Sequence, residues 1–175
     1  MLTLKELYEV VGKPTTINGK MGKDTLCFNT DPEQCVIGSQ LRKNPKSVCF
    51  SCYSLRLCNF RTNVHESYRR NHKLLLDALM SKGHEVVADM VSRIIEKKDR
   101  LKVRVKDGGD VVDESEFDMW WSVAKRNLKR RYWLPTKEYA KLRNFLRRVG
   151  KLPKNLVIRV SSPLVNQPPM QEFEH

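Results

Sequence analysis

The stretch that decides the fold is Leu101–Asp110, which reads Leu-Lys-Val-Arg-Val-Lys-Asp-Gly-Gly-Asp. Within it the apolar residues Leu101, Val103 and Val105 alternate with basic residues, and a period of two is typical of a β-strand. The two glycines near its end interrupt the alternation, because glycine favours a turn. The sequence therefore predicts a strand that ends in an Asp-Gly-Gly-Asp turn.

Two more strand-like segments follow, and a helical pattern precedes each of them. Tyr132–Leu134 is a short aromatic strand that Pro135 is expected to end, and Leu156–Val160 is the last strand. Strands that alternate with helices in this way predict a parallel sheet with crossover helices. The apolar faces of the two helices consist of Phe117, Trp120, Trp121 and Ala124, and of Tyr139, Leu142, Phe145, Leu146 and Val149.

The segment upstream of these strands extends the same pattern. Thr25–Phe28 has the character of a short strand, and two helical segments follow, from Asn63 to about residue 81 and around Val87–Ile95. Asn63, with Glu66 three positions on, predicts the N-terminal cap of the first of these helices. The predicted fold class is α/β, an open or partial (β/α) barrel of about four mainly parallel strands with a Cys-rich N-terminal metal loop.

We expect a single domain over residues 1–175, because 175 residues is an ordinary length for one domain. Residues 24–62 would form the Cys-rich loop, residues 63–163 the helices and remaining strands, and residues 164–175 a loose tail. Residues 1–6 are too polar for a secretory signal, and no apolar run is long enough to cross a membrane. The predicted location is therefore the cytoplasm, with no membrane partner.

The formal net charge of +13 arises from 33 lysines and arginines against 20 acidic residues. An excess of this size favours contact with nucleic acid or an acidic protein surface, and it also suits a merely solubilising surface. Basic residues concentrate between Lys125 and Lys154, with Tyr132, Trp133 and Tyr139 among them. The candidate partner-binding residues are Lys129, Arg130, Arg131, Arg143, Arg147 and Arg148.

All five cysteines lie between Cys27 and Cys58, which favours a metal site over a disulfide framework in a cytosolic chain. Cys49 and Cys52 form a C-x-x-C pair, with Cys35 upstream and Cys58 downstream. These four thiolates suit tetrahedral zinc and a four-iron cluster equally well, and their spacing does not decide between the two. Cys27 is an alternative ligand, and either Cys27 or Cys58 could be the spare one. Buried cysteines without any metal are the simpler alternative.

Sites in parallel α/β folds form beyond the carboxyl ends of the strands. The candidate ligand-binding residues at the end of the strand quoted first are Asp107, Gly108, Gly109 and Asp110. The glycines would let the backbone approach a ligand, and the aspartates would accept hydrogen bonds from an amine or a ribose. A tight strand-to-helix turn explains the glycines equally well. His65 and His72 share a helix face and are either metal-site residues or part of a partly exposed face.

Several of these segments, taken in order, resemble the phage "gene product 88" family. They are Cys49-Phe50-Ser51-Cys52-Tyr53, Asn63-Val64 with Arg70-Asn71, Val105–Asp110 with Trp120, Tyr132–Lys137, and Leu156–Ser162. The resemblance covers most of Cys35–Pro163. It implies a phage-encoded protein, located in the host cytoplasm, whose partial barrel is similar to that of radical S-adenosylmethionine enzymes.

In such enzymes an iron–sulfur cluster lies in a cysteine loop after the first strand, and S-adenosylmethionine is a second cofactor. The resemblance therefore favours iron–sulfur, as 4Fe-4S, over zinc. This chain lacks their compact C-x-x-x-C-x-x-C loop, and a fourth cysteine would leave no open iron. We accordingly consider three functions: an iron–sulfur protein with a structural or redox-active cluster and a basic face for a host or phage partner, a radical-SAM-like enzyme, and a zinc-stabilised nucleic-acid-binding module.

Overall fold

The computed structural model describes residues 2–16, 22–168 and 173. Seven α-helices, one 3-10 helix and four strands are found in these residues. In chain order they are α1 (Leu4–Val11), β1 (Thr25–Phe28), the 3-10 helix η1 (Pro32–Gln34), α2 (Val36–Leu41), α3 (Tyr53–Phe60), α4 (Thr62–Lys82), α5 (His84–Lys98), β2 (Lys102–Val105), α6 (Ser115–Arg126), β3 (Arg131–Thr136), α7 (Tyr139–Val149) and β4 (Leu156–Val160).

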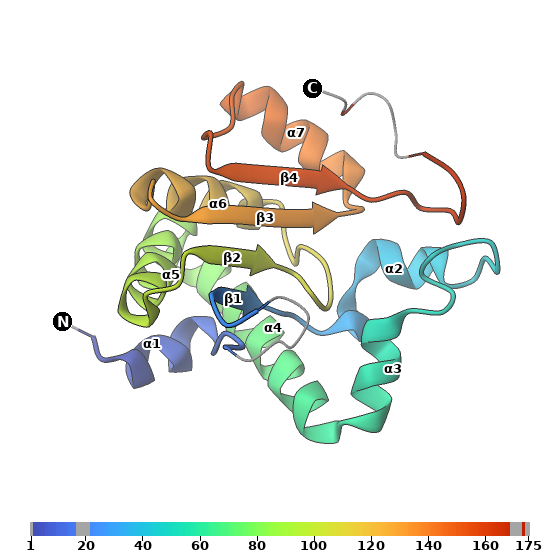
Figure 1. Ribbon diagram of the computed structural model, residues 1–175, viewed down its shortest axis with the longest axis horizontal. Helices are drawn as coiled ribbons and strands as arrows, with labels where there is room; N and C mark the ends of the chain where they lie inside the picture. Colours follow the sequence, from blue (N-terminus) through green and yellow to red (C-terminus); the bar gives the residue numbers. More distant parts are fainter. Residues whose placement is uncertain (1, 17–21, 169–172, 174–175) are drawn as a thin grey trace.

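The four strands form one open sheet in the order β1-β2-β3-β4, and all neighbouring strands are parallel (Figure 1). A parallel neighbour requires a crossover, and helices α5, α6 and α7 occupy the connections between successive strands. The predicted α/β class with an open sheet of four parallel strands is therefore confirmed.

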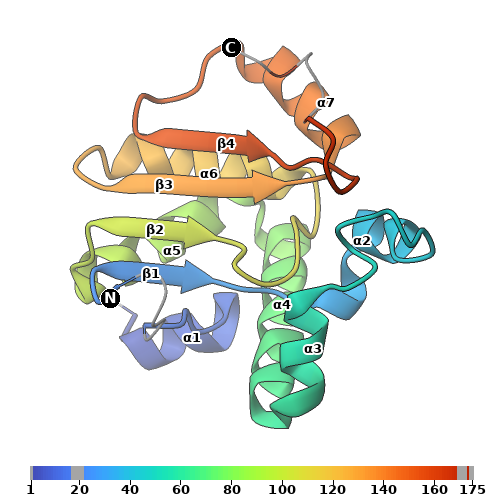
Figure 2. The same ribbon diagram turned by 45° about the vertical axis from the view of Figure 1, so that its right-hand side comes forward.

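The core lies between one face of the sheet and the helices packed on it. Val103, Tyr132 and Leu134 point into this core, and Trp120 of α6 meets Phe28 edge to face with ring centroids 5.1 Å apart. Figures 1 and 2 show α5 and α6 behind the strands, and in the described part of the chain no helix lies in front of them. The sheet is thus covered by helices on one side.

Pro135 does not end β3, contrary to the sequence-based expectation, because the strand continues to Thr136. The backbone amides of β3 point alternately to β2 and to β4: Arg131 donates to the Leu101 carbonyl and Tyr132 to the Asn155 carbonyl. By this alternation position 135 faces β2, whose pairing with β3 ends at Trp133. No amide is needed there, so proline is tolerated.

The predicted cap at Asn63 is also wrong, since α4 begins at Thr62 and its N-terminal flanking residue is Arg61. The Asn63 side chain accepts a hydrogen bond from the amide of its immediate neighbour, Val64, at 2.9 Å. The C-terminal end of the helix agrees with the predicted end at about residue 81, because α4 ends at Lys82 and Gly83 follows it with a positive φ of 78°.

The first residues of the predicted loose tail are held in place. Leu164 bridges Ser47, and the Val165 amide donates to the Lys46 carbonyl at 2.9 Å. Residues 169–172 and 174–175 of this tail lie outside the described residues. The chain after β4 therefore returns to the cysteine loop and holds it against the end of the sheet.

Candidate metal site at the carboxyl ends of the strands

A cavity of about 280 Å³ opens at the carboxyl ends of β2 and β3. Helices α2 and α3 lie beyond the arrowheads of these strands and close one side of it (Figures 1 and 2). Cys35, Cys49 and Cys52 all line this cavity, although they come from different parts of the loop. The cavity is therefore where the fold brings the cysteines together.

Cys35 lies at the start of α2 and is the N-cap residue of that helix. Its sulfur occupies the space that a side chain at Gly38 would need, because a Cβ there would stand 2.7 Å from Cys35 Sγ. Burial, and next the negative charge of Asp110, raise the pKa of the Cys35 thiol to about 12. Gly38, about one turn further along the same helix, thus leaves the space that the Cys35 sulfur occupies.

Cys49 and Cys52 flank a turn before α3. The Cys49 amide donates to the hydroxyl of Ser47 at 3.0 Å, and Ser47 itself is buried. Burial raises the pKa of the Cys49 thiol, although the neighbouring Lys137 ammonium acts in the opposite direction. The Val48 amide donates to the Pro163 carbonyl, so the segment after β4 also fixes this turn.

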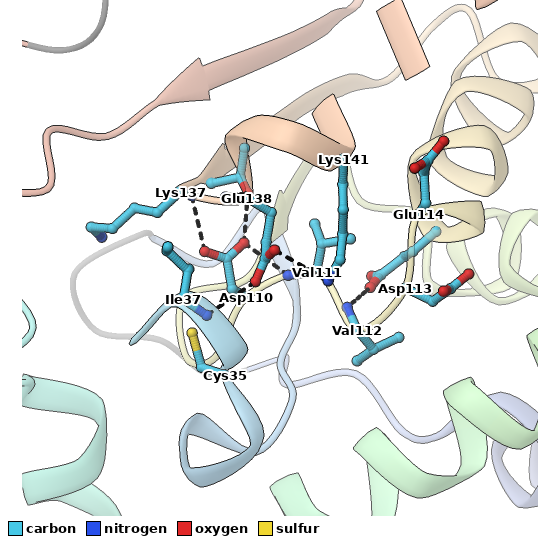
Figure 3. A network of polar contacts seen from close by, with 12 residues as sticks. Cys35, Ile37, Asp110, Val111, Val112, Asp113, Glu114, Lys137, Glu138 and Lys141 are labelled. Atoms are coloured by element: carbon cyan, nitrogen blue, oxygen red, sulfur yellow. Dashed lines mark hydrogen bonds and ion pairs between the residues drawn. The ribbon is translucent and has the colours of Figure 1, made fainter. Parts of the chain in front are cut away.

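Asp110 lies next to Cys35, above it in Figure 3, and connects the loops that follow β2 and β3. Its carboxylate accepts hydrogen bonds from the Val111 amide at 2.8 Å, the Thr136 hydroxyl at 2.7 Å and the Lys137 amide at 3.0 Å. Burial raises the pKa of this carboxyl even though these three donors favour its charged form. Asp110 therefore has a structural role in addition to its place in the cavity wall.

Glu138 continues this network toward α2 (Figure 3). Its amide donates to the Thr136 hydroxyl at 3.0 Å, and its carboxylate accepts from the Ile37 amide at 3.3 Å and pairs with Lys141 at 3.1 Å. Ile37 is two residues after Cys35, so the loop after β3 holds the helix that carries this cysteine. Sequence reasoning missed Glu138, because its contacts join segments about a hundred positions apart.

The predicted ligand-binding turn Asp107–Asp110 borders the cavity through Asp107, Gly109 and Asp110. A Cβ at Gly108 would lie 2.6 Å from the Ser54 hydroxyl, and one at Gly109 would lie 2.4 Å from the Thr30 hydroxyl. Gly109 also has a φ of 81°, a left-handed conformation that favours glycine. Packing against the protein itself is therefore enough to explain both glycines.

Positive charge predominates in the cavity wall. Four basic residues line it against two aspartates, and Lys106 among them is buried and pairs with Glu116 of α6 at 2.8 Å. Of these groups Lys137 lowers the pKa of the Cys49 thiol, although burial outweighs it, whereas the Asp110 carboxylate raises the pKa of the Cys35 thiol. The basic residues of the wall are Arg42, Arg104, Lys106 and Lys137.

Cys58 and Cys27 do not line this cavity. Cys58 is buried in α3, where burial and then the carboxylates of Asp31 and Glu33 raise the pKa of its thiol to about 11. Cys27 is buried in β1, where the sheet register places it opposite Arg104 of β2. Its neighbours in the strand, Leu26 and Phe28, belong to the hydrophobic core. The five cysteines thus divide into three at the cavity and two elsewhere.

His65 of α4 lies in a second cluster, near Cys58. Its Nε2 atom is 3.4 Å from Asp31 and 3.6 Å from Glu33, and the three ligand atoms lie within 4.8 Å of one another. Arg69 also reaches Glu33, at 2.9 Å, and so already supplies a cation to these carboxylates. His65 and the cavity cysteines therefore belong to separate clusters.

The predicted partner-binding residues differ in their surroundings: some form ion pairs within the protein, and others are exposed. Arg130 pairs with Asp99 at 2.8 Å, and Arg148 pairs with Asp118 at 2.6 Å and also with Glu114. Lys129 and Arg131 are exposed near the start of β3. Arg147 is exposed on α7, which also carries the half-buried Arg143.

The fold and the cavity define this molecule as an α/β protein with an open parallel sheet and a cysteine-lined cavity at the carboxyl ends of its strands. The model of the gene product 88 family matches residues 16–171, and the chain belongs to this family, the phage family that its motifs resemble. No curated protein and no solved structure matches the chain. Within the described residues, no helix is both long and apolar enough to cross a membrane.

Proposed function

We propose that this protein binds a [4Fe–4S] cluster through Cys35, Cys49 and Cys52, with Cys27 and Cys58 outside the ligand set. The observation that carries the proposal is the cavity itself, since three cysteines from separate segments line it together. Thiolates are the ligands of such clusters, and the Lys137 ammonium near Cys49 would offset part of their negative charge. The space at Gly38, which the sulfur of Cys35 fills, also supports a fixed ligand position.

The three cavity sulfurs do not all lie within 4.8 Å of one another, which favours a cluster over zinc. A tetrahedral zinc site brings its sulfurs within about 4 Å of one another, since each zinc–sulfur bond is about 2.3 Å long. Among the residues that the structure describes, the one group of three ligand atoms within 4.8 Å consists of Asp31, Glu33 and His65, and contains no cysteine. A four-iron cube holds its cysteines further apart, because each binds a different iron.

Anaerobic purification followed by metal analysis tests this proposal. We expect a brown protein with broad visible absorption that contains iron and acid-labile sulfide in equal amounts. A colourless protein with one zinc ion would contradict the proposal and would favour the zinc-stabilised nucleic-acid-binding module instead. Reconstitution with iron and sulfide under the same conditions serves as the positive control for cluster loss during purification.

A second candidate function is an enzyme that uses S-adenosylmethionine, and the number of cavity cysteines favours it. Three ligands leave one iron with a free coordination position, at which such a cluster can bind a small molecule and supply an electron. Asp107 and Asp110 border the same cavity and would accept hydrogen bonds from an amino group. The test is calorimetric titration of the cluster-loaded protein with S-adenosylmethionine, with adenosine as the control, and absence of saturable binding would exclude this function.

A further inference from the structure

The face of the sheet opposite the helices forms a shallow groove of about 580 Å³. Its outward side chains come from alternate positions of β2, β3 and β4, whose other positions belong to the core. Parallel sheets are usually covered on both faces. Figures 1 and 2 show no helix over this face in the part of the chain that the structure describes. The open sheet face is therefore available to a partner.

All the charged residues that line the groove on the open sheet face are basic. Four of the nine residues that line the groove are basic and none is acidic. Arg104 pairs with Asp107 at 3.1 Å, whereas the other three make no ion pair with any described residue. These three are Lys102, Arg131 and Arg159, and all are exposed. A partner that complements this face carries several negative charges.

An aromatic ring lies among these cations. Trp133 of β3 is 38% exposed, and the Arg104 guanidinium stacks on its ring, 4.0 Å from the centroid. In the register of the sheet, Trp133 lies between Arg104 of β2 and Val157 of β4, which is 49% exposed. The open sheet face thus has an apolar row, with Lys102 and Arg131 on one side of it and Arg159 on the other.

We propose that the open sheet face binds single-stranded nucleic acid. Basic side chains attract the phosphates of a strand, and an exposed indole stacks on an unpaired base. A duplex hides its bases from such a ring, and an acidic peptide has no planar base to stack on it. Arg104 borders both the groove and the cysteine cavity, so a bound strand would lie beside that cavity.

The experiment is fluorescence anisotropy with short labelled oligouridine and oligothymidine, with duplex DNA and polyglutamate as competitors. We expect the single strands to bind, and both competitors to displace them poorly. Failure of the wild-type protein to bind single strands at low salt would overturn the proposal. Equal displacement by duplex or polyglutamate would do so as well, because it would show a general attraction for anions.

The double variant Arg131→Gln/Arg159→Gln tests the cations of this face. If both arginines contact phosphates, the slope of log affinity against log salt should fall by about 1.4, which is about 0.7 per contact on a single strand. The matched control Lys5→Gln/Lys82→Gln removes the same charge from exposed helical positions and should retain the slope. Equal losses in the two double variants would overturn the proposal.

Trp133→Leu tests the stacking ring and keeps an apolar side chain on the strand. We expect it to weaken single-strand binding about tenfold, as loss of one stacked base does. Circular dichroism should match that of the wild type, and unchanged affinity would overturn the stacking role. Repeating the measurement with the Cys35→Ala variant separates this proposal from that of the cluster, because nucleic-acid binding should persist without the metal.

Discussion

At the scale of single residues, the pairing of Cys35 with Gly38 is the most specific feature of the cavity. Gly38 is buried in α2, and the Cys35 sulfur fills the space beside it. This glycine has no left-handed φ, so its small size rather than its backbone freedom explains its presence. A glycine three positions after a cysteine is visible in the sequence, but only the structure reveals its role.

Gly38→Ala should therefore displace the Cys35 sulfur and reduce the cluster content. The added methyl would lie 2.7 Å from Sγ, and overpacking of this kind costs about 1–3 kcal/mol. We expect the iron content per protein to fall well below that of the wild type after identical reconstitution. Gln40→Ala on the exposed side of the same helix is the matched control, and retention of full iron by Gly38→Ala would contradict the role of this contact.

The Cys35 thiol also predicts a pH dependence for the metal-free protein. Its pKa is raised from 9.0 to about 12 by the fold, so the fold favours the neutral thiol. The stabilisation is fully present below about pH 9 and is lost as the pH rises toward about 12. We expect the free energy of unfolding in urea to fall over this range, and to fall less steeply in Cys35→Ala. Parallel pH profiles for the two proteins would refute this assignment.

At the scale of elements, a buried ion pair joins the carboxyl end of β2 to α6. Lys106 and Glu116 are almost fully buried and lie 2.8 Å apart. Glu116 also accepts hydrogen bonds from the Val112 amide at 2.8 Å and from the Trp120 indole at 3.0 Å. The pair therefore fixes the direction in which the chain leaves the sheet and enters the turn that borders the cavity.

Lys106→Met should destabilise the protein by about 3–5 kcal/mol, because it leaves a buried carboxylate without its counter-charge. Adding Glu116→Gln should recover part of this loss, since the amide oxygen still accepts from Val112 and Trp120. Urea unfolding of the wild type, both single variants and the double variant gives the coupling energy. Additive effects of the two substitutions would show that the pair is not coupled.

Strand and helix types were predictable from local patterns, whereas some ends were not. The alternation from Leu101 to Val105 and the stripe of α7 correspond to β2 and to α7 as observed. Pro135 misled the prediction, because whether proline fits a strand depends on the side to which its missing amide would point. That information lies in the pairing with β2, which the sequence of β3 does not contain.

At the scale of the whole molecule, the sequence was sufficient to place the cysteines at the carboxyl ends of the strands, because a loop after β1 in a parallel sheet must open there. It could not divide the five cysteines. Cys52 borders the cavity, while Cys58, about 1.7 helical turns further along the chain, is buried near Asp31 and Glu33. This division depends on how α3 is rotated against its neighbours, which residue spacing alone does not determine.

The most direct test of the central claim is the iron content of five single Cys→Ala variants after anaerobic reconstitution. We predict that Cys35→Ala, Cys49→Ala and Cys52→Ala lose the cluster and its visible absorption. Cys27→Ala and Cys58→Ala should retain both, since neither residue lines the cavity. Loss of the cluster in Cys58→Ala, with circular dichroism that shows an intact fold, would contradict the three-cysteine site and indicate a fully ligated cluster.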